Sequence, residues 1–84
     1  MDARAQRVKR LRWLCRRGMK ELDVCLQCWM EHHAHTDDQT LAAFEALLAL
    51  PDDRLWDGLR GAWQPDAPLQ REILHQLRGL YTRH

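Results

Sequence analysis

Serine is absent from this sequence of 84 residues, and β-branched residues are scarce. Only two valines, one isoleucine and three threonines stand against 14 leucines. Because β-sheets are enriched in β-branched side chains, this composition argues against a substantial sheet and predicts an all-α protein. A serine nucleophile is excluded. The sequence also contains no HExxH, phosphate-loop or GxGxxG motif, so metal hydrolysis and nucleotide chemistry have no support.

Long apolar runs are missing as well. No stretch approaches the length of a membrane span, and the start Met1-Asp2-Ala3-Arg4 is polar with no apolar leader behind it. Three cysteines, an odd number, do not suggest a disulfide framework. We therefore expect a cytoplasmic protein with reduced thiols and no membrane insertion. With no repeat and no long linker, residues 1–84 should form a single domain with a small core.

Hydrophobic spacing predicts five helices with short connections, packed as a compact bundle. The first is expected from about Ala3 to Arg16, and Gly18 is its natural C′ residue. The second is expected from about Met19 to His33.

A start signal for the third helix follows at residues 36–39. Thr36 with Gln39 fits a capping box, and Asp37 is an alternative cap. Pro51 should end this helix, because a residue before proline is disfavoured in the helical conformation.

Two further helices are predicted after Pro51. Asp52 or Asp53 should cap the fourth, which ends near Gly61. Asp66 should cap the fifth, with Pro68 in its first turn.

The net charge of +1 hides an asymmetry along the chain. Residues 1–20 carry eight basic side chains and one acidic one, whereas residues 21–72 carry eleven acidic and three basic ones. A basic arm on an acidic body could bind nucleic acid, an anionic cofactor or an acidic protein surface, or could be only a solvated amphipathic helix. Recognition motifs for nucleic acid are missing and the acidic body would repel phosphate, so no nucleic acid is expected.

A CxxC motif offers two further alternatives. Cys25 and Cys28, with His32 and His35, have spacing that could bind zinc, and the same two thiols could form a redox pair. The expected position inside a helix, with no second cysteine pair and no preceding strand, disfavours both. No metal is therefore expected, and the role of this cysteine pair stays open.

The segment from residue 15 to 23 lies at the junction of the first two expected helices. Gly18 permits a tight turn there. Arg16 and Arg17 precede the glycine, and Glu21 and Asp23 follow it. Because the two carboxylates lie two residues apart on a helix, they point about 200° apart and cannot act on one atom. A rigid bend that carries both signs of charge is suited to meeting another surface.

The run Trp13-Leu14-Cys15-Arg16-Arg17-Gly18-Met19-Lys20-Glu21-Leu22-Asp23 resembles the signature of the SdhE-type flavinylation factors. These are small succinate dehydrogenase assembly factors of bacteria, with mitochondrial relatives. The RGxxE element of that family corresponds to Arg17, Gly18 and Glu21. The resemblance extends over residues 7 to 60, with weaker matches at Trp29-Met30-Glu31-His32 and beyond. Cys25 and Cys28 are not part of the family pattern, and Gly58 stands where an aromatic residue is expected.

The resemblance implies a five-helix bundle that is not itself an enzyme. Such proteins bind the flavoprotein subunit of succinate dehydrogenase, and often of the related fumarate reductase, and promote covalent attachment of FAD to one of its histidines. The FAD then belongs to the client, and no tightly bound cofactor is expected. A helper can act by holding the client in the orientation that favours attack, which requires differential affinity but no catalytic group.

The resemblance also implies a set of partner-binding residues, namely Arg17, Gly18, Glu21, Arg16, Trp13, Met19 and Asp23. Arg17 is expected to donate charge-assisted hydrogen bonds to the client, and Gly18 to let the client backbone approach. Glu21 should orient Arg17 or pair with a client base. In a purely structural alternative, Arg17 and Glu21 form only a local ion pair and Gly18 is only a helix cap.

Two other functions stay open at the level of sequence. One is an antitoxin-like interaction protein, and the other is a nucleic-acid-binding regulatory protein that uses the basic first helix. The expected state is a monomer or a weak dimer, the latter through exposed Trp13 and Trp63.

Overall fold

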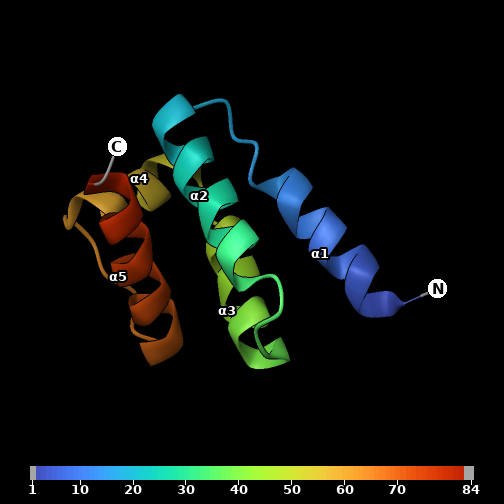
Figure 1. Cartoon of the computed structure of the whole chain (residues 1–84). Coiled ribbons are helices and arrows are strands. Elements are labelled where there is room, and N and C mark those ends of the chain that lie inside the picture. Colours follow the sequence, from blue (N-terminus) through green and yellow to red (C-terminus); the bar gives the residue numbers. More distant parts are fainter. Residues whose placement is uncertain (1, 83–84) are drawn as a thin grey trace.

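The computed structural model describes residues 2–82 and contains five α-helices (Figure 1). They are α1 (Ala3–Leu14), α2 (Lys20–His33), α3 (Asp38–Leu48), α4 (Asp52–Arg60) and α5 (Pro68–Thr82). No strand occurs in this part of the chain. The prediction of an all-α, five-helix fold is therefore confirmed. Within the same residues, no helix is long and apolar enough to cross a membrane.

Helix α5 packs against α2, α3 and α4, whereas α1 packs mainly against α2. Figure 1 shows α1 beside α2, on the side away from α5, with its N-terminal end projecting from the bundle. The molecule is accordingly elongated, with extents of 40 × 26 × 23 Å. One face of α1 is thus turned to the bundle, and the opposite face is left to solvent.

Trp29 of α2 lies at the centre of the core. Its ring stacks on Phe44 of α3 at a centroid distance of 4.2 Å and on His33 at 4.3 Å. Its indole Nε1–H donates to Oε1 of Gln76 at 2.8 Å, which satisfies a polar group that would otherwise be buried without a partner. The core is otherwise apolar and is drawn from all five helices, including Leu11, Cys15, Leu22, Leu26, Met30, Leu41, Leu47, Leu55, Leu59, Ile73, Leu74 and Leu77.

The helix ends confirm some of the predicted caps and correct others. Asp37 caps α3 by accepting a hydrogen bond from the Thr40 backbone N–H at 2.8 Å, so the alternative to the capping box is the one observed. Pro51 rather than Asp52 or Asp53 occupies the N-cap of α4, and the predicted acidic cap is wrong. Proline fits this position because the N-cap backbone is extended and a proline N–H is not needed there.

Gly58 and Trp63 mark the contact between α4 and α5. A Cβ added at Gly58 would lie 3.1 Å from Cδ1 of Leu74, so glycine permits a close approach of the two helices. Trp63 is half-buried against the core, and the Arg54 guanidinium lies 5.1 Å from its ring centroid. The prediction that Trp63 is exposed for dimer formation is therefore wrong, whereas Trp13 is 67% exposed.

Candidate functional site

The bend between α1 and α2 is held by one carboxylate. Helix α1 ends at Leu14 with Cys15 as its C-cap, so Gly18 lies beyond the C′ position that the sequence predicted for it. Its φ of 89° is nevertheless in the region that favours glycine. Asp23 accepts hydrogen bonds from the backbone N–H groups of Arg17 at 2.7 Å and Gly18 at 3.2 Å. These two bonds fix the path of the backbone through the bend.

Arg17 reaches inward from the bend and ties it to the α3–α4 connection. Its Nε donates to the Asp52 carboxylate at 2.6 Å, its Nη1 to the Leu48 carbonyl at 2.6 Å, and its Nη2 to the Leu50 carbonyl at 2.5 Å. We call these three contacts the Arg17 clamp. Carbonyls at a helix end have no intrahelical partner and favour a cation, so the clamp also caps the C-terminus of α3. The Arg17 side chain is only 14% exposed.

Arg17 does not form the expected ion pair with Glu21. The guanidinium is paired with Asp52, which lies 35 residues further along the chain, and not with Glu21. Glu21 is exposed at the start of α2 and lines a shallow hollow of about 510 Å³ with Lys20, Val24, Cys25 and Tyr81. The carboxylate is therefore presented to solvent beside an apolar patch.

Four of the seven predicted site residues are exposed to solvent. We call Trp13, Arg16, Gly18 and Glu21 the bend surface; all four are exposed. The Arg16 guanidinium lies 5.6 Å from the centroid of the Trp13 ring, a cation–π distance that orients both groups. A Cβ added at Gly18 would have no neighbour within 4 Å, so the backbone of the bend is open to an approaching molecule.

The other three predicted residues support this surface from within. Met19 is half-buried and packs against the core. Asp23 and Arg17 are half-buried, and their polar side-chain atoms make the hydrogen bonds of the bend and of the Arg17 clamp. The structure thus divides the seven predicted residues into four that are exposed and three that are half-buried.

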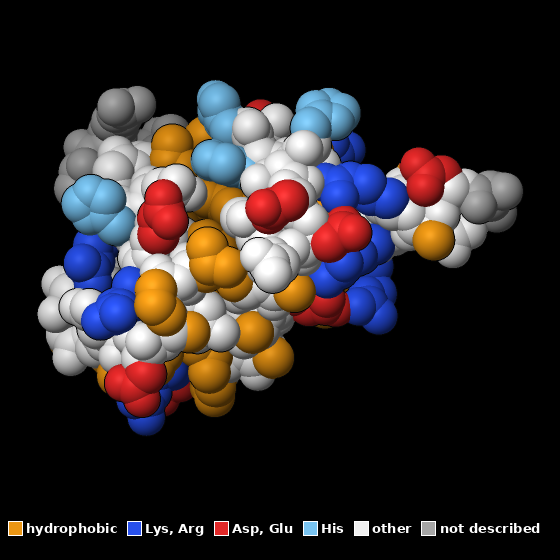
Figure 2. All heavy atoms as spheres, turned by 90° about the horizontal axis from the view of Figure 1, so that it is seen from below, with side chains coloured by type: hydrophobic (Ala, Val, Ile, Leu, Met, Phe, Trp, Pro, Cys, Tyr) orange, Lys and Arg blue, Asp and Glu red, His pale blue; other side chains and the backbone are white. Residues whose placement is uncertain are grey.

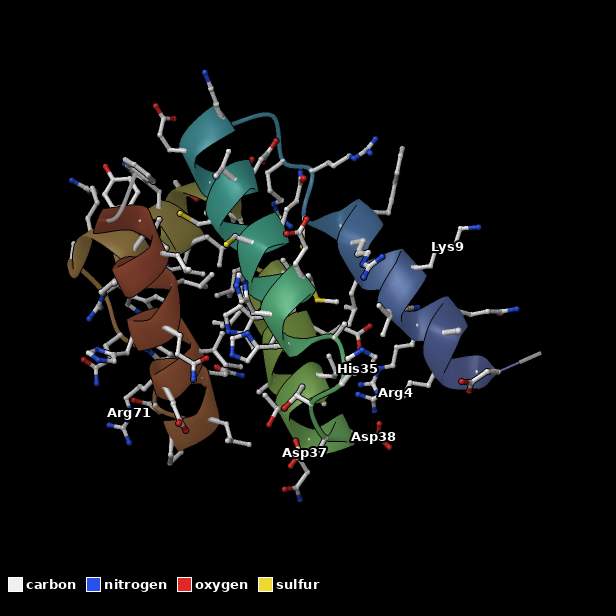
Figure 3. The ribbon with its side chains drawn as sticks, viewed as in Figure 1. Arg4, Lys9, His35, Asp37, Asp38 and Arg71 are labelled. Carbon is white, nitrogen blue, oxygen red and sulfur yellow. The ribbon has the colours of Figure 1, made fainter. Side chains whose placement is uncertain are left out.

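Much of the basic charge of α1 is neutralised inside the molecule. Arg4 donates to the Asp38 carboxylate at 2.7 Å and to two carbonyls of the α2–α3 connection, and Figure 3 shows it reaching toward that connection. Arg7 and Arg10 both pair with Glu45 of α3. Figure 2 accordingly shows Lys and Arg side chains with acidic ones among them, where α1 meets the body. The basic first helix is in large part a docking element for the acidic body.

The three cysteines differ in burial, with Cys15 and Cys25 buried and Cys28 half-buried. Burial raises the pKa of the Cys15 thiol to about 12, with smaller opposing effects of Arg17 and Asp23. Burial also raises the pKa of Cys25, while Cys28 is half-buried with its sulfur 3.7 Å from Nδ1 of His32. Across residues 2–82, no three Cys, His, Asp or Glu side chains gather where they could hold a metal ion.

Asp52, Val24 and Tyr81 are site residues that sequence reasoning missed. The sequence predicts only that Asp52 or Asp53 caps the fourth helix. Only the fold shows that it faces an arginine 35 positions earlier. Val24 and Tyr81 come from different helices, and no local pattern predicts that they share a hollow.

Comparison with known proteins gives consistent matches over most of the chain. The family model described as flavinator of succinate dehydrogenase matches residues 9–81. The FAD assembly factor SdhE of Methylococcus capsulatus is 42% identical over 73 residues, covering 84% of this chain and 87% of that protein. SdhE of Coxiella burnetii is 34% identical (86% and 89% covered), and SdhE of Pectobacterium atrosepticum 39% (76% and 75%). No solved structure matches.

Proposed function

This chain belongs to the family of flavinators of succinate dehydrogenase, and we propose that it binds the flavoprotein subunit of that enzyme and promotes covalent attachment of FAD. The proposal extends to the flavoprotein subunit of the related fumarate reductase. The comparisons do not support the alternatives of an antitoxin-like or nucleic-acid-binding protein.

The proposed mechanism is conformational. The bend surface docks on the client and favours the domain orientation in which a client histidine attacks the flavin. Such a proximity effect requires only that the factor bind this orientation more tightly than others. The chain then contributes no catalytic group, and the FAD remains with the client. We also propose that the free protein binds no FAD tightly and works in the cytoplasm.

The assignment of the surface rests on the resemblance of Arg17, Gly18 and Glu21 to the RGxxE element, together with the geometry of Gly18. Gly18 combines a positive φ of 89° with open space where a side chain would begin. The fold of this chain thus needs a glycine at position 18 for its backbone conformation, while the space beside that glycine is open to solvent. A client backbone can approach this point without meeting a side chain.

The experiment compares covalent flavin in the client from cells that lack this protein. In-gel flavin fluorescence of the succinate dehydrogenase flavoprotein subunit is measured after complementation with wild type, Gly18→Arg or Glu21→Ala. We expect wild type to restore the signal and both variants to fail. The variants test the open backbone and the exposed carboxylate separately.

Gly61 supplies a matched control for Gly18. It has a φ of 82°, is exposed, and an added Cβ would meet nothing within 4 Å, yet it lies at the end of α4. An arginine costs about 1–2 kcal/mol of backbone strain at either position. Gly61→Arg should therefore lose similar stability and keep flavinylation. Glu72→Ala, an exposed site on α5, is the control for Glu21→Ala.

Three outcomes would contradict the proposal at different levels. Unchanged client flavin in the deletion strain would remove the proposed function for this client. Normal flavinylation with both Gly18→Arg and Glu21→Ala would show that the bend surface is not the site. Equal losses with Gly18→Arg and Gly61→Arg would assign the effect to backbone strain alone.

A further inference from the structure

We propose that the outer face of α1 is a second contact surface, which binds an acidic segment of the flavoprotein client. It consists of Lys9, Arg12, Trp13 and Arg16, which we call the α1 strip. This inference rests on the proposed function and deepens it, because it names the chemistry of the client segment. Two of the four residues, Lys9 and Arg12, lie outside the bend surface.

The spacing of the α1 strip places its side chains together. The four residues stand at i, i+3, i+4 and i+7, which is one face of a helix and of its C-terminal continuation. All four are exposed. Figure 3 shows Lys9 pointing away from the bundle, whereas Arg4 on the same helix reaches toward the connection before α3.

Charge distinguishes the α1 strip from the rest of α1. Arg4, Arg7 and Arg10 are each paired with a carboxylate of α3. Within residues 2–82, Lys9, Arg12 and Arg16 have no carboxylate oxygen within 4 Å, and the Arg16 guanidinium lies over the Trp13 ring. Like charges three and four residues apart on a helix repel each other. An acidic partner would relieve this repulsion.

Two acidic residues of the chain lie near the α1 strip without neutralising it. Glu31 lines a hollow of about 300 Å³ with Arg12, Arg16 and Gln27, but no ion pair within 4 Å forms there. Asp2 lines a groove beside Lys9 and Trp13, and its carboxylate accepts from the Arg4 backbone N–H at the start of α1. The cationic excess on this face is therefore available to another molecule.

Continuity with the bend surface favours the flavoprotein client as the source of the acidic segment. Arg16 precedes Gly18 by two residues and lines one hollow with Arg12, so a client that contacts Gly18 lies close to the C-terminal end of the α1 strip. An exposed tryptophan beside an arginine is a common anchor of protein interfaces. Nucleic acid fits less well, because three cations over about 10 Å of helix would neutralise only a few phosphates.

The test measures client binding and its dependence on salt. The apo flavoprotein subunit of succinate dehydrogenase is immobilised, and association and dissociation rates are recorded at 50 and 300 mM NaCl. The proteins are wild type, Lys9→Glu, and a triple variant with Lys9→Glu, Arg12→Glu and Arg16→Glu. Arg71→Glu is the matched control, because Arg71 is exposed on α5 and Figure 3 shows it on the opposite side of the molecule from Lys9.

We expect the Kd to rise about threefold with Lys9→Glu and about tenfold or more with the triple variant, mainly through slower association. The salt dependence should flatten in the triple variant, and Arg71→Glu should change the Kd less than about twofold. Circular dichroism confirms the helical fold of each variant. A benzophenone crosslinker at position 9 should capture a client peptide rich in Asp and Glu.

Several results would overturn the inference while leaving the proposed function intact. One is wild-type affinity and salt dependence in the triple variant. Another is a crosslinked client peptide that is basic or apolar. A third is binding of a short DNA or RNA duplex that the triple variant loses while client binding is unchanged. Failure of wild type to bind the client at all would instead remove the proposed function, and the inference with it.

Discussion

Replacing Arg17 by alanine should destabilise the protein far more than replacing its neighbour Arg16. The two arginines are adjacent in the chain, but the Arg17 side chain is 14% exposed and makes the three contacts of the clamp. Arg16 is exposed and contacts the Trp13 ring. The pair therefore separates a half-buried cation with three internal contacts from a surface cation at nearly the same point of the chain.

The magnitude follows from the contacts that are lost. A hydrogen bond contributes about 1 kcal/mol net, so three bonds give about 3 kcal/mol. The Asp52 side chain is 40% exposed, and solvent screening reduces the share of its ion pair, so we expect a loss of about 2–3 kcal/mol. A domain of 84 residues has a free energy of unfolding of about 4–13 kcal/mol. Arg17→Ala thus removes a large fraction of the total.

The assay is urea unfolding followed by circular dichroism at 222 nm, together with thermal melting. Arg17→Ala should lower the free energy of unfolding by about 2–3 kcal/mol and the Tm by about 10–20 °C. Arg16→Ala should change it by about 0.5 kcal/mol or less. A double-mutant cycle with Asp52→Ala should give a coupling energy of about 0.5–3 kcal/mol, because the two side chains are in contact.

Equal effects of Arg17→Ala and Arg16→Ala would refute this reasoning. So would a coupling energy near zero between Arg17 and Asp52. Either result would mean that the Arg17 guanidinium is not committed to the α3–α4 connection in solution. It would then be available to contact the client directly, as the sequence alone suggested.

Three further predictions concern helix packing, thiol reactivity and the pH dependence of stability. In urea unfolding, Gly58→Ala should lower the free energy of unfolding by about 1 kcal/mol, because the added Cβ would lie 3.1 Å from the Leu74 side chain. Gly79→Ala should raise the free energy of unfolding by about 0.5–1 kcal/mol, because the added Cβ has no neighbour within 4 Å. A gain in stability at both sites would contradict the close approach of α4 and α5. In the native protein Ellman's reagent should react first with half-buried Cys28 and leave buried Cys15 protected. Modification of Cys15 before Cys28 at neutral pH would contradict the burial of Cys15. Burial raises the pKa of the Cys15 thiol from 9.0 to about 12 in the folded state, so the unfolded chain releases this proton first. The free energy of unfolding should therefore fall as pH rises from about 9 to 12.

Local patterns predicted the helices well because each helix carries its own signal. The apolar spacing of α2 and α3, the Asp37 cap and the left-handed Gly61 at the end of α4 are all properties of a few consecutive residues. The errors in bounds are small and lie at helix ends. Helix α1 ends at Leu14 rather than near Arg16, which moves Gly18 away from the C′ position without changing its need for a positive φ.

The orientation of the charged residues could not be predicted in the same way. Whether Arg17 faces a client or the core depends on Leu48, Leu50 and Asp52, which lie more than 30 positions away. A glycine bend with flanking charges is compatible with either orientation. The sequence therefore located the bend correctly but could not divide its residues into those that are exposed and those that stabilise the bend from inside.

The internal contacts of Asp23 and Arg17 keep the bend in one conformation, which affects how tightly it could bind a client. If the factor works by preferring one client conformation, its own surface must be largely in the binding-competent state, because the apparent Kd rises as the competent fraction falls. Asp23 fixes the bend backbone and the Arg17 clamp fixes the bend to α3 and α4, so both raise that fraction without touching the client. Gly18 and Glu21 are instead exposed to solvent, where a client could contact them. The RGxxE element of this protein therefore combines an arginine that ties the bend to the α3–α4 connection with a glycine and a glutamate that are exposed to solvent.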